Sequence, residues 1–421
     1  MIATTAVANG EDRAIDLSLA RAYFDEAAAI SDLDGGELWG RPLYGPMIFA
    51  DPGTRMVVAN EADRNAAREP EGDVFVGTWP LAKNIVNSAV VWSGKQWTMV
   101  MWPLPVSKKP RARLLAHEMW HRIQNNIGLS AIGADNGHLD TPSGRIWMRL
   151  EWRAWSRAIG SAGEERREAI GDALGFRAMR RSLCKGASKA ERTLENNEAL
   201  AEYTGVVLAG WSKSELAKQI QDDLAEADKG DSFVRSFAYH TGPVIGVLLD
   251  EIKPDWSWYY NRSNELPARL RVALKIAMPK DLTAFAESRM KLYGGDKIRE
   301  EERLREGRRQ QRLAAARAKF IDGPTLRIRL VNMKIQFDPN TLQPLDRVGA
   351  VYPTLRIRDV WGTLEVEDGA LVAAGWKSLT VSVAPDWDGK VTERKGVWKL
   401  DLQWPWRIER AKKSGNWVLT R

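Results

Sequence analysis

Cysteine and histidine are both scarce in this chain of 421 residues. The single cysteine, Cys184, excludes an intramolecular disulfide and a metal site built from several thiolates. Because the chain has only four histidines, a regular spacing between two of them is informative. The chain also lacks an apolar run of the roughly 18 to 20 residues that a membrane-spanning helix needs. These absences predict a protein without a transmembrane segment and with few candidate metal ligands.

The charge of the chain restricts its partners only loosely. The 62 Lys and Arg residues outnumber the 55 Asp and Glu residues, so the formal net charge is +7. Such an excess favours anionic partners such as nucleic acid, anionic lipid or a cell-wall polymer. However, many basic residues stand beside acidic ones, as in residues 164–168 and 299–302, which is typical of solvated helix faces. We therefore expect no specific nucleic-acid partner.

The first residues carry a weak signal for export. Ala6-Val7-Ala8 has the small-x-small form of a signal-peptide cleavage site. Neither a basic segment nor a full apolar segment precedes it. A secreted or periplasmic location is slightly favoured over a cytoplasmic one.

Three regions differ in the periodicity of their apolar residues. Residues 1–105 contain short β-type runs, which predict a strand-rich N-terminal region. Residues 106–320 carry apolar residues at helical spacing and end in a long charged segment that we expect to be a connector helix. Residues 321–421 alternate apolar and polar residues, which predicts a small all-β domain with Trp404 and Trp406 in its core. The expected fold class is α+β.

A His-Glu-x-x-His motif lies in the segment Leu114–Gln124. His117 and His121 are four residues apart, so a helix places both imidazoles on one face, one turn from each other. They can then bind one Zn²⁺ at about 2.0–2.1 Å each. The carboxylate of Glu118 can reach the water at the open metal position and accept its proton. The motif therefore predicts one zinc ion per chain, with Glu118 as the general base.

An acidic segment, Leu194–Gly205, reads Leu-Glu-Asn-Asn-Glu-Ala-Leu-Ala-Glu-Tyr-Thr-Gly. It resembles the third-ligand helix of gluzincin metallopeptidases, which reads Asn-Glu-x-x-x-acidic in thermolysin-like enzymes. It is also similar to the Glu-Gly-x-Ala-x-Tyr segment of the aminopeptidase branch. The resemblance implies that Glu198 is the third metal ligand and that Glu202 orients a metal-bound histidine. It also implies that residues 106–320 form a zincin-like catalytic domain, of which residues 1–105 are the strand-rich N-terminal part.

A second resemblance lies in residues 238–249, which read Ala-Tyr-His-Thr-Gly-Pro-Val-Ile-Gly-Val-Leu-Leu. This segment is similar to the Tyr-x-x-Gly helix of the aminopeptidase branch, in which the tyrosine hydroxyl stabilises the oxyanion as water attacks a carbonyl. Tyr239 matches that tyrosine, and a phenol can donate a hydrogen bond without adding a second charge. His240 is the alternative donor.

Two other residues compete for the position of third ligand. His138 lies in a loop-like segment, and nothing in its spacing requires it to bind a metal. Glu151 lies in a helical segment between Arg149 and Arg153, so an ion pair is the simpler account of its presence. The metzincin arrangement fails, because it requires a glycine and a histidine three and six residues after His121, where this chain has other residues.

The resemblance covers roughly residues 110–250 and departs from the family in two respects. The spacing from His121 to Glu198 is longer than in compact members. The Gly-Ala-Met-Glu-Asn strand of aminopeptidases is absent before His117, and the strand Trp97–Trp102 occupies its place, where it could pair with an extended substrate. Because that strand lacks an acidic anchor for a substrate amine, we expect an endopeptidase that acts on a peptide or protein substrate.

Two other functions remain compatible with these residues. The same site could hydrolyse a non-peptide amide, because both reactions need an activated water and a polarised carbonyl. The chain could also be a basic, tryptophan-rich binding module with a relict metal site. A non-catalytic zinc site has no need of a carboxylate beside its first ligand, so the presence of Glu118 favours a hydrolase.

Overall fold

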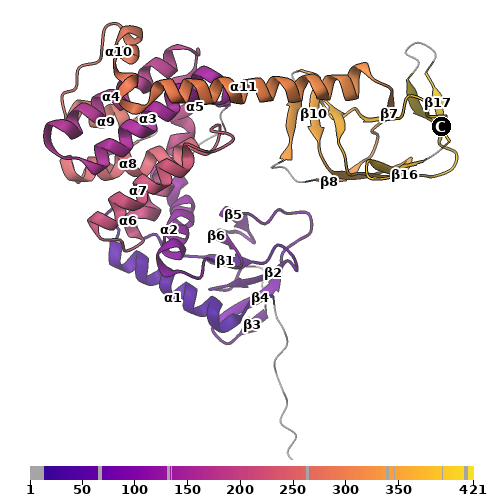
Figure 1. Ribbon diagram of the computed structural model, residues 1–421. Coiled ribbons are helices and arrows are strands. Elements are labelled where there is room, and N and C mark those ends of the chain that lie inside the picture. The colour runs from indigo at the N-terminus through magenta and orange to yellow at the C-terminus, as the bar shows by residue number, and fades with distance from the viewer. Residues whose placement is uncertain are drawn as a thin grey trace, which may run out of the picture. The chain divides into compact units, whose positions relative to one another are not determined.

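The structure is a computed structural model that describes residues 14–64, 69–129, 133, 135–261, 265–337, 341–345, 347–390, 392–411 and 416–421. The candidate export motif Ala6–Ala8 lies outside these residues. The chain is mixed α+β and divides into two compact units, residues 1–302 and 303–421 (Figure 1). The division falls within the charged helix α11, Gly295–Arg317, in the segment expected to be a connector. None of the described helices has the length and apolar character needed to cross a bilayer.

The first unit begins with a helix and a six-stranded sheet. The strands are β1 Met47–Ala50, β2 Met56–Ala59, β3 Glu69–Glu71, β4 Val74–Thr78, β5 Ser88–Trp92 and β6 Lys95–Met101, in the order β3-β4-β2-β1-β6-β5. Strands β1 and β6 are parallel, and the other neighbours are antiparallel. The expected strand-rich region is therefore present, with β5 at an edge of the sheet.

Helix α1, Leu17–Asp34, was missed by the sequence analysis. Asp16 caps it by accepting a hydrogen bond from the Leu19 N–H, and its buried residues recur at helical spacing. Phe24 on this helix stacks on Phe49 of β1 with the ring centroids 4.4 Å apart, so α1 covers one face of the sheet. The periodicity that would have revealed the helix is present in the sequence.

A bundle of helices follows the sheet and carries the expected helical periodicity. The helices are α2 Lys108–Gln124, α3 Pro142–Gly160, α4 Gly163–Ser182, α5 Ala187–Leu194, α6 Leu200–Leu208, α7 Lys213–Ala227, α8 Phe237–Ile252, α9 Leu266–Ala273 and α10 Leu282–Arg289. A π-helical turn, Glu195–Ala199, lies between α5 and α6, within the segment that resembles a third-ligand helix. π-Helical turns are rare in proteins, but those that occur are often found at functional sites.

Two glycines allow three of these helices to approach closely. A Cβ atom at Gly205 of α6 would lie 2.7 Å from the Arg113 carbonyl oxygen of α2. A Cβ atom at Gly242 of α8 would lie 2.3 Å from the Ala199 carbonyl oxygen, at the end of the π-helical turn. Both distances are too short for a real side chain, so glycine is required at each helix crossing. Gly242 is the glycine of the Tyr-x-x-Gly segment.

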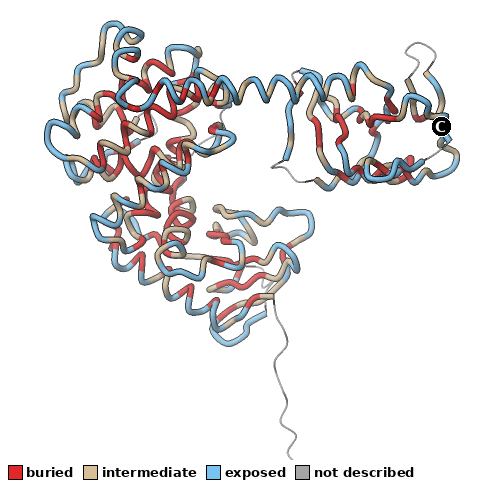
Figure 2. Tube along the Cα trace, in the orientation of Figure 1, coloured by how far each residue is buried: buried red, intermediate tan, exposed pale blue. Residues whose placement is uncertain are grey.

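The second unit contains the C-terminal β domain expected for residues 321–421. One sheet has the order β17-β18-β7-β14-β13-β10-β9 and the other β15-β16-β12-β11-β8, and residues of both form one core. The strands are β7 Thr325–Arg329, β8 Lys334–Gln336, β9 Gln343–Leu345, β10 Gly349–Tyr352, β11 Leu355–Asp359, β12 Gly362–Val366, β13 Ala370–Ala373, β14 Ser378–Ser382, β15 Glu393–Arg394, β16 Trp398–Leu402, β17 Arg407–Arg410 and β18 Trp417–Thr420. The buried positions alternate along β11 and β16, as expected for strands with one face in the core. Figure 2 shows that buried segments lie inside each of the two units, whereas most of α11 is exposed or intermediate.

One prediction for this domain was wrong. Trp406 packs against the core, but the side chain of Trp404 is 93% exposed in the turn between β16 and β17. Sequence periodicity does not distinguish the end of a buried strand from the tip of the turn that follows it.

Candidate metal centre

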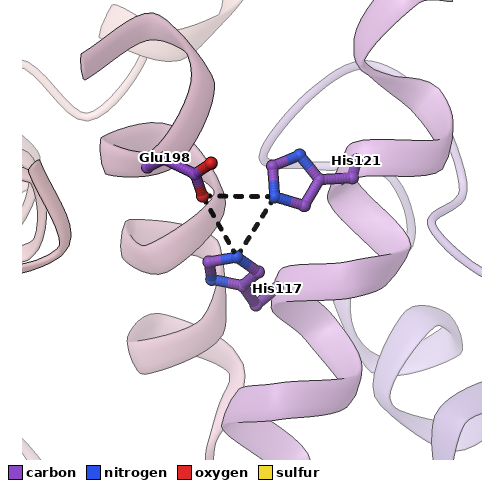
Figure 3. A group of neighbouring side chains, drawn as sticks. All are labelled: His117, His121 and Glu198. Atoms are coloured by element: carbon purple, nitrogen blue, oxygen red, sulfur yellow. Dashed lines mark hydrogen bonds and ion pairs between the residues drawn. The ribbon is translucent and has the colours of Figure 1, made fainter. Parts of the chain in front are cut away.

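Three side chains from two helical segments converge on one point (Figure 3). Helix α2 presents His117 and His121 on one face, and the π-helical turn presents Glu198 opposite them. The Nε2 atoms of the two histidines are 3.1 Å apart. The Glu198 Oε2 atom lies 3.7 Å from the Nε2 atom of His117 and 3.5 Å from the Nε2 atom of His121. One ligand atom from each residue lies within 4.8 Å of the others, so the cluster could hold a metal ion.

The chemistry of the cluster fits a bound cation. Glu198 Oε2 is buried and has no hydrogen-bond partner among the described residues. Burial disfavours a charge on Glu198, but the nearby His117, His121 and Tyr239 side chains outweigh it and lower the pKa of this carboxyl. Glu198 is therefore an ionised oxygen donor pointing at two imidazole nitrogens.

His117 is oriented by a carboxylate behind it. Its Nδ1 atom is 2.6 Å from Glu202 Oε2, which leaves Nε2 directed at the cluster. Glu202 also accepts from Arg113, which in turn pairs with Asp223 at 2.7 Å. Burial opposes a charge on His117, but the neighbouring carboxylates of Glu198 and Glu202 outweigh it and raise its pKa to about 10. A metal that binds here therefore displaces a proton.

His121 is oriented by an amide that the sequence analysis missed. The Nδ1 atom of His121 is 3.2 Å from Gln124 Oε1, and Gln124 Nε2 donates to Asn197 Oδ1 at 3.1 Å and to the Leu129 carbonyl at 2.7 Å. Gln124 therefore connects the second histidine to the residue beside Glu198. The spacing of three between His121 and Gln124 places both on one helix face and was the available signal.

Glu118 lies in the same cavity as the cluster and is nearly fully buried. Its Oε2 atom has no hydrogen-bond partner among the described residues. Burial raises the pKa of this carboxyl, although His117 and His121 act against the shift. Glu118 thus has a proton affinity above the ordinary value, and it lines the same cavity as the three candidate ligands.

Tyr239 reaches this cavity, whereas His240 does not line it. The Tyr239 ring stacks on His117 with centroids 5.6 Å apart and an interplanar angle of 4°. Burial and the Glu198 charge raise the pKa of Tyr239, so its hydroxyl stays protonated and can donate. The His240 ring instead meets Trp152 edge to face at 5.8 Å, and burial lowers its pKa. Of the two candidate donors, the structure brings only Tyr239 to the cluster.

Two residues that precede Glu198 in the π-helical turn are held by contacts with other segments. Glu195 forms an ion pair with Arg177 inside the helical bundle. The Tyr260 hydroxyl donates to Asn196 Oδ1 at 2.7 Å. These contacts hold the backbone from which Glu198 projects.

The two rival ligands lie in a buried network of charges away from the cluster. Glu151 is fully buried and pairs with Arg177 and Arg180. The ion-pair interpretation of Glu151 is confirmed, but with partners from α4 rather than its sequence neighbours. The His138 Nε2 atom is 2.9 Å from Glu191 Oε1 in the same network.

The cluster opens on a cavity of about 770 Å³ beside the edge strand β5. Ser88 and Ala89 of β5 line it, together with Arg235 and the metal-centre residues. The prediction that Trp97–Trp102 could pair with a substrate was wrong, because β6 already pairs with β1 on one side and β5 on the other. Among the described strands, β5 lies at the edge of this sheet and lines the cavity.

Comparisons with protein-family models, with curated proteins and with solved structures find no match for this chain.

Proposed function

We propose that the chain is a zinc-dependent metallopeptidase, with endopeptidase action on a peptide or protein substrate. The observation that carries this proposal is the meeting of His117, His121 and Glu198, with Glu118 and Tyr239 lining the same cavity. Two imidazoles and one carboxylate form the ligand set of many catalytic zinc sites, which keep a fourth position open.

The spacing of the donor atoms supports zinc. Three donors at about 2.0–2.1 Å from a tetrahedral zinc ion lie about 3.3 Å from one another. The three separations in the cluster are 3.1, 3.5 and 3.7 Å. When bound, zinc would lower the pKa of a coordinated water and polarise the carbonyl of the substrate.

Glu118 would carry the proton in the reaction. Its raised pKa and unpartnered oxygen suit a group that accepts a proton from the attacking water and gives it to the leaving amine. Glu118 follows His117 by one residue, so it points about 100° away around the helix and is not an equivalent third ligand.

Tyr239 would stabilise the charge that develops on the carbonyl oxygen. Its hydroxyl remains a donor because its pKa is raised, and its stacking on His117 holds the ring beside the ligand atoms. A fixed donor of this kind acts mainly in the transition state.

The edge strand β5 favours an extended substrate. Its outer edge has no strand partner among the described residues, and Ser88 and Ala89 line the cavity. A peptide that adds to this edge would form main-chain hydrogen bonds and pass the cluster. Such binding needs no free substrate terminus, which supports internal cleavage.

The proposal is tested by turnover of an unfolded protein substrate by the wild type and by Glu118→Gln, both loaded with zinc. Glutamine keeps the shape of the side chain but cannot accept a proton, so the variant should bind zinc and show no cleavage above background. Glu215→Gln, an exposed substitution on α7, is the matched control and should keep full activity. Equal turnover by Glu118→Gln and the wild type, or no cleavage by the zinc-loaded wild type, would contradict the proposal.

A further inference from the structure

Five turns meet at one end of the C-terminal β domain and form what we call the loop face: residues 330–333, 347–348, 359–361, 374–377 and 403–406. The antiparallel pairings of β7 with β14, β11 with β12 and β12 with β16 bring the ends of these strands together. Backbone hydrogen bonds join the turns directly. The Leu330 N–H donates to the Lys377 carbonyl at 3.0 Å, the Ala374 N–H to Val348 at 3.0 Å, and the Gln403 N–H to Trp361 at 3.0 Å.

The exposed apolar side chains of this domain gather on the loop face. Among the described residues of 321–421, the large apolar side chains that are exposed are Val331, Val348, Val360 and Trp404, with exposed fractions of 60%, 38%, 45% and 93%. All four lie in these turns. The described turns at the opposite end of the domain, including residues 384–390, expose no large apolar side chain. Isolated exposed apolar residues need no explanation, but their confinement to one end does.

Cations surround these apolar tips. Arg329, Arg347 and Lys377 are exposed beside the turns, and none of them forms an ion pair with a described residue. The nearby Asp359 carboxylate is occupied, because it accepts the backbone N–H groups of Val331 and Asn332 at 2.8 Å each. Residues 303–421 contain 23 Lys and Arg against 13 Asp and Glu, so this unit carries more than the net positive charge of the chain.

We infer that the loop face is a docking surface for an anionic lipid bilayer. The indole of Trp404 suits the boundary between headgroups and acyl chains, where tryptophan is enriched. Val331 and Val360 would bury apolar area in the same boundary, and the surrounding cations would meet the negative headgroups. The chain would bind as a peripheral protein, which agrees with the lack of a membrane-spanning helix among the described residues.

The chemistry of the tips distinguishes a bilayer from other anionic partners. A single-stranded nucleic acid would use cations and aromatic stacking but gains little from exposed valines. A stable contact with a second protein needs a matching surface of roughly 800 Å² from each partner. A fluid bilayer needs no such match, because it can fit around apolar side chains at the tips of several turns.

The test is flotation of the full-length chain with vesicles of phosphatidylcholine, with and without phosphatidylglycerol. We expect the chain to float with the anionic vesicles and not with the neutral ones. Trp404→Ala should lower the partition coefficient about tenfold, the effect of removing one large apolar side chain from the boundary. Arg329→Gln and Lys377→Gln should each lower it about fivefold. Leu81→Ser, at a residue 88% exposed in the first unit, is the matched control and should leave binding unchanged.

Three outcomes would overturn the inference. The first is no flotation with the anionic vesicles. The second is flotation that Trp404→Ala leaves unchanged, and the third is equal flotation with neutral vesicles, which would remove the role of the cations. Binding to single-stranded DNA that Trp404→Ala weakens, together with no vesicle binding, would assign the loop face to a nucleic acid instead. The Glu118→Gln variant should float like the wild type, because the inference does not depend on catalysis.

Discussion

At the scale of single residues, the two histidines of the candidate metal centre have different supports. His117 has the carboxylate of Glu202 behind it, whereas His121 has the neutral amide of Gln124. A carboxylate raises the basicity of the imidazole that it contacts more than an amide does. One carboxylate and one amide behind the histidines carry less negative charge than two carboxylates would. A metal ion bound here would therefore remain more electrophilic.

The Tyr239 hydroxyl should matter for the rate and little for substrate binding. Tyr239→Phe removes one donor while keeping the ring that stacks on His117. We predict that kcat falls by roughly 10- to 1000-fold with a small change in KM, because the lost interaction is made mainly in the transition state. Steady-state kinetics on a defined peptide checks this. A wild-type kcat would return Tyr239 to a packing role.

At this scale, local spacing made much of the site predictable. The histidine pair follows from the helical repeat, and Glu198 and Glu202 follow from the motif resemblance and lie where they were expected. Gln124 and Arg113 were missed because glutamine and arginine on a helix face are common without any function. Only the approach of α6, made possible by Gly205, gives Arg113 its place beside Glu202.

At the scale of elements, the π-helical turn Glu195–Ala199 joins the candidate site to a buried charge network. Glu195 pairs with Arg177, and Arg177 pairs with Glu151, so the backbone that carries Glu198 rests on these ion pairs. Arg180 completes the network through Glu151 and Glu191, with its side chain fully buried. Loss of one charge would leave its partners buried and unpaired.

We predict that Arg180→Ala lowers the free energy of unfolding by about 3–5 kcal/mol. The matched control is Arg157→Ala, which removes an exposed pair with Glu165 and should cost at most about 1 kcal/mol. Urea denaturation followed by circular dichroism measures both variants. Equal costs for the two substitutions would show that the network does not stabilise the fold.

The same network should make stability depend on acid. Burial opposes a charge on Glu191, but Arg180 and its other partners outweigh it and hold the pKa of this carboxyl well below 4.5. The pKa of Glu191 is therefore lower in the folded chain than in the unfolded chain. The resulting stabilisation is fully present above the pKa of the unfolded chain and is lost as the pH falls through the pKa of the folded chain. The wild type should therefore lose stability on acidification below about pH 4.5. Arg180→Ala should lose less over the same range.

The elements themselves were only partly predictable. The hairpin of β5 and β6 follows from local alternation, but which of the two strands lies at the edge depends on the parallel pairing of β1 with β6, which joins residues about 50 positions apart. The π-helical turn cannot be seen in a sequence, because one extra residue in a helical turn barely changes the apolar pattern.

At the scale of the whole molecule, the two units differ in charge as well as in fold. Residues 303–421 hold 23 basic and 13 acidic residues, which leaves 39 basic and 42 acidic residues for 1–302. The candidate metal centre and its cavity belong entirely to the first unit. The loop face belongs to the second. The net charge of the whole chain does not reveal this difference between the units, because the excess of basic residues in the second unit is partly cancelled by the excess of acidic residues in the first.

The proposed function requires that His117, His121 and Glu198 bind one zinc ion. The most direct measurement is the zinc content per chain, by elemental analysis after dialysis against zinc-free buffer. We predict one zinc in the wild type and in Glu118→Gln, and near-complete loss in His121→Ala and Glu198→Ala, with circular dichroism confirming that each variant folds. Full zinc retention by folded His121→Ala or Glu198→Ala would contradict the assignment of the metal centre.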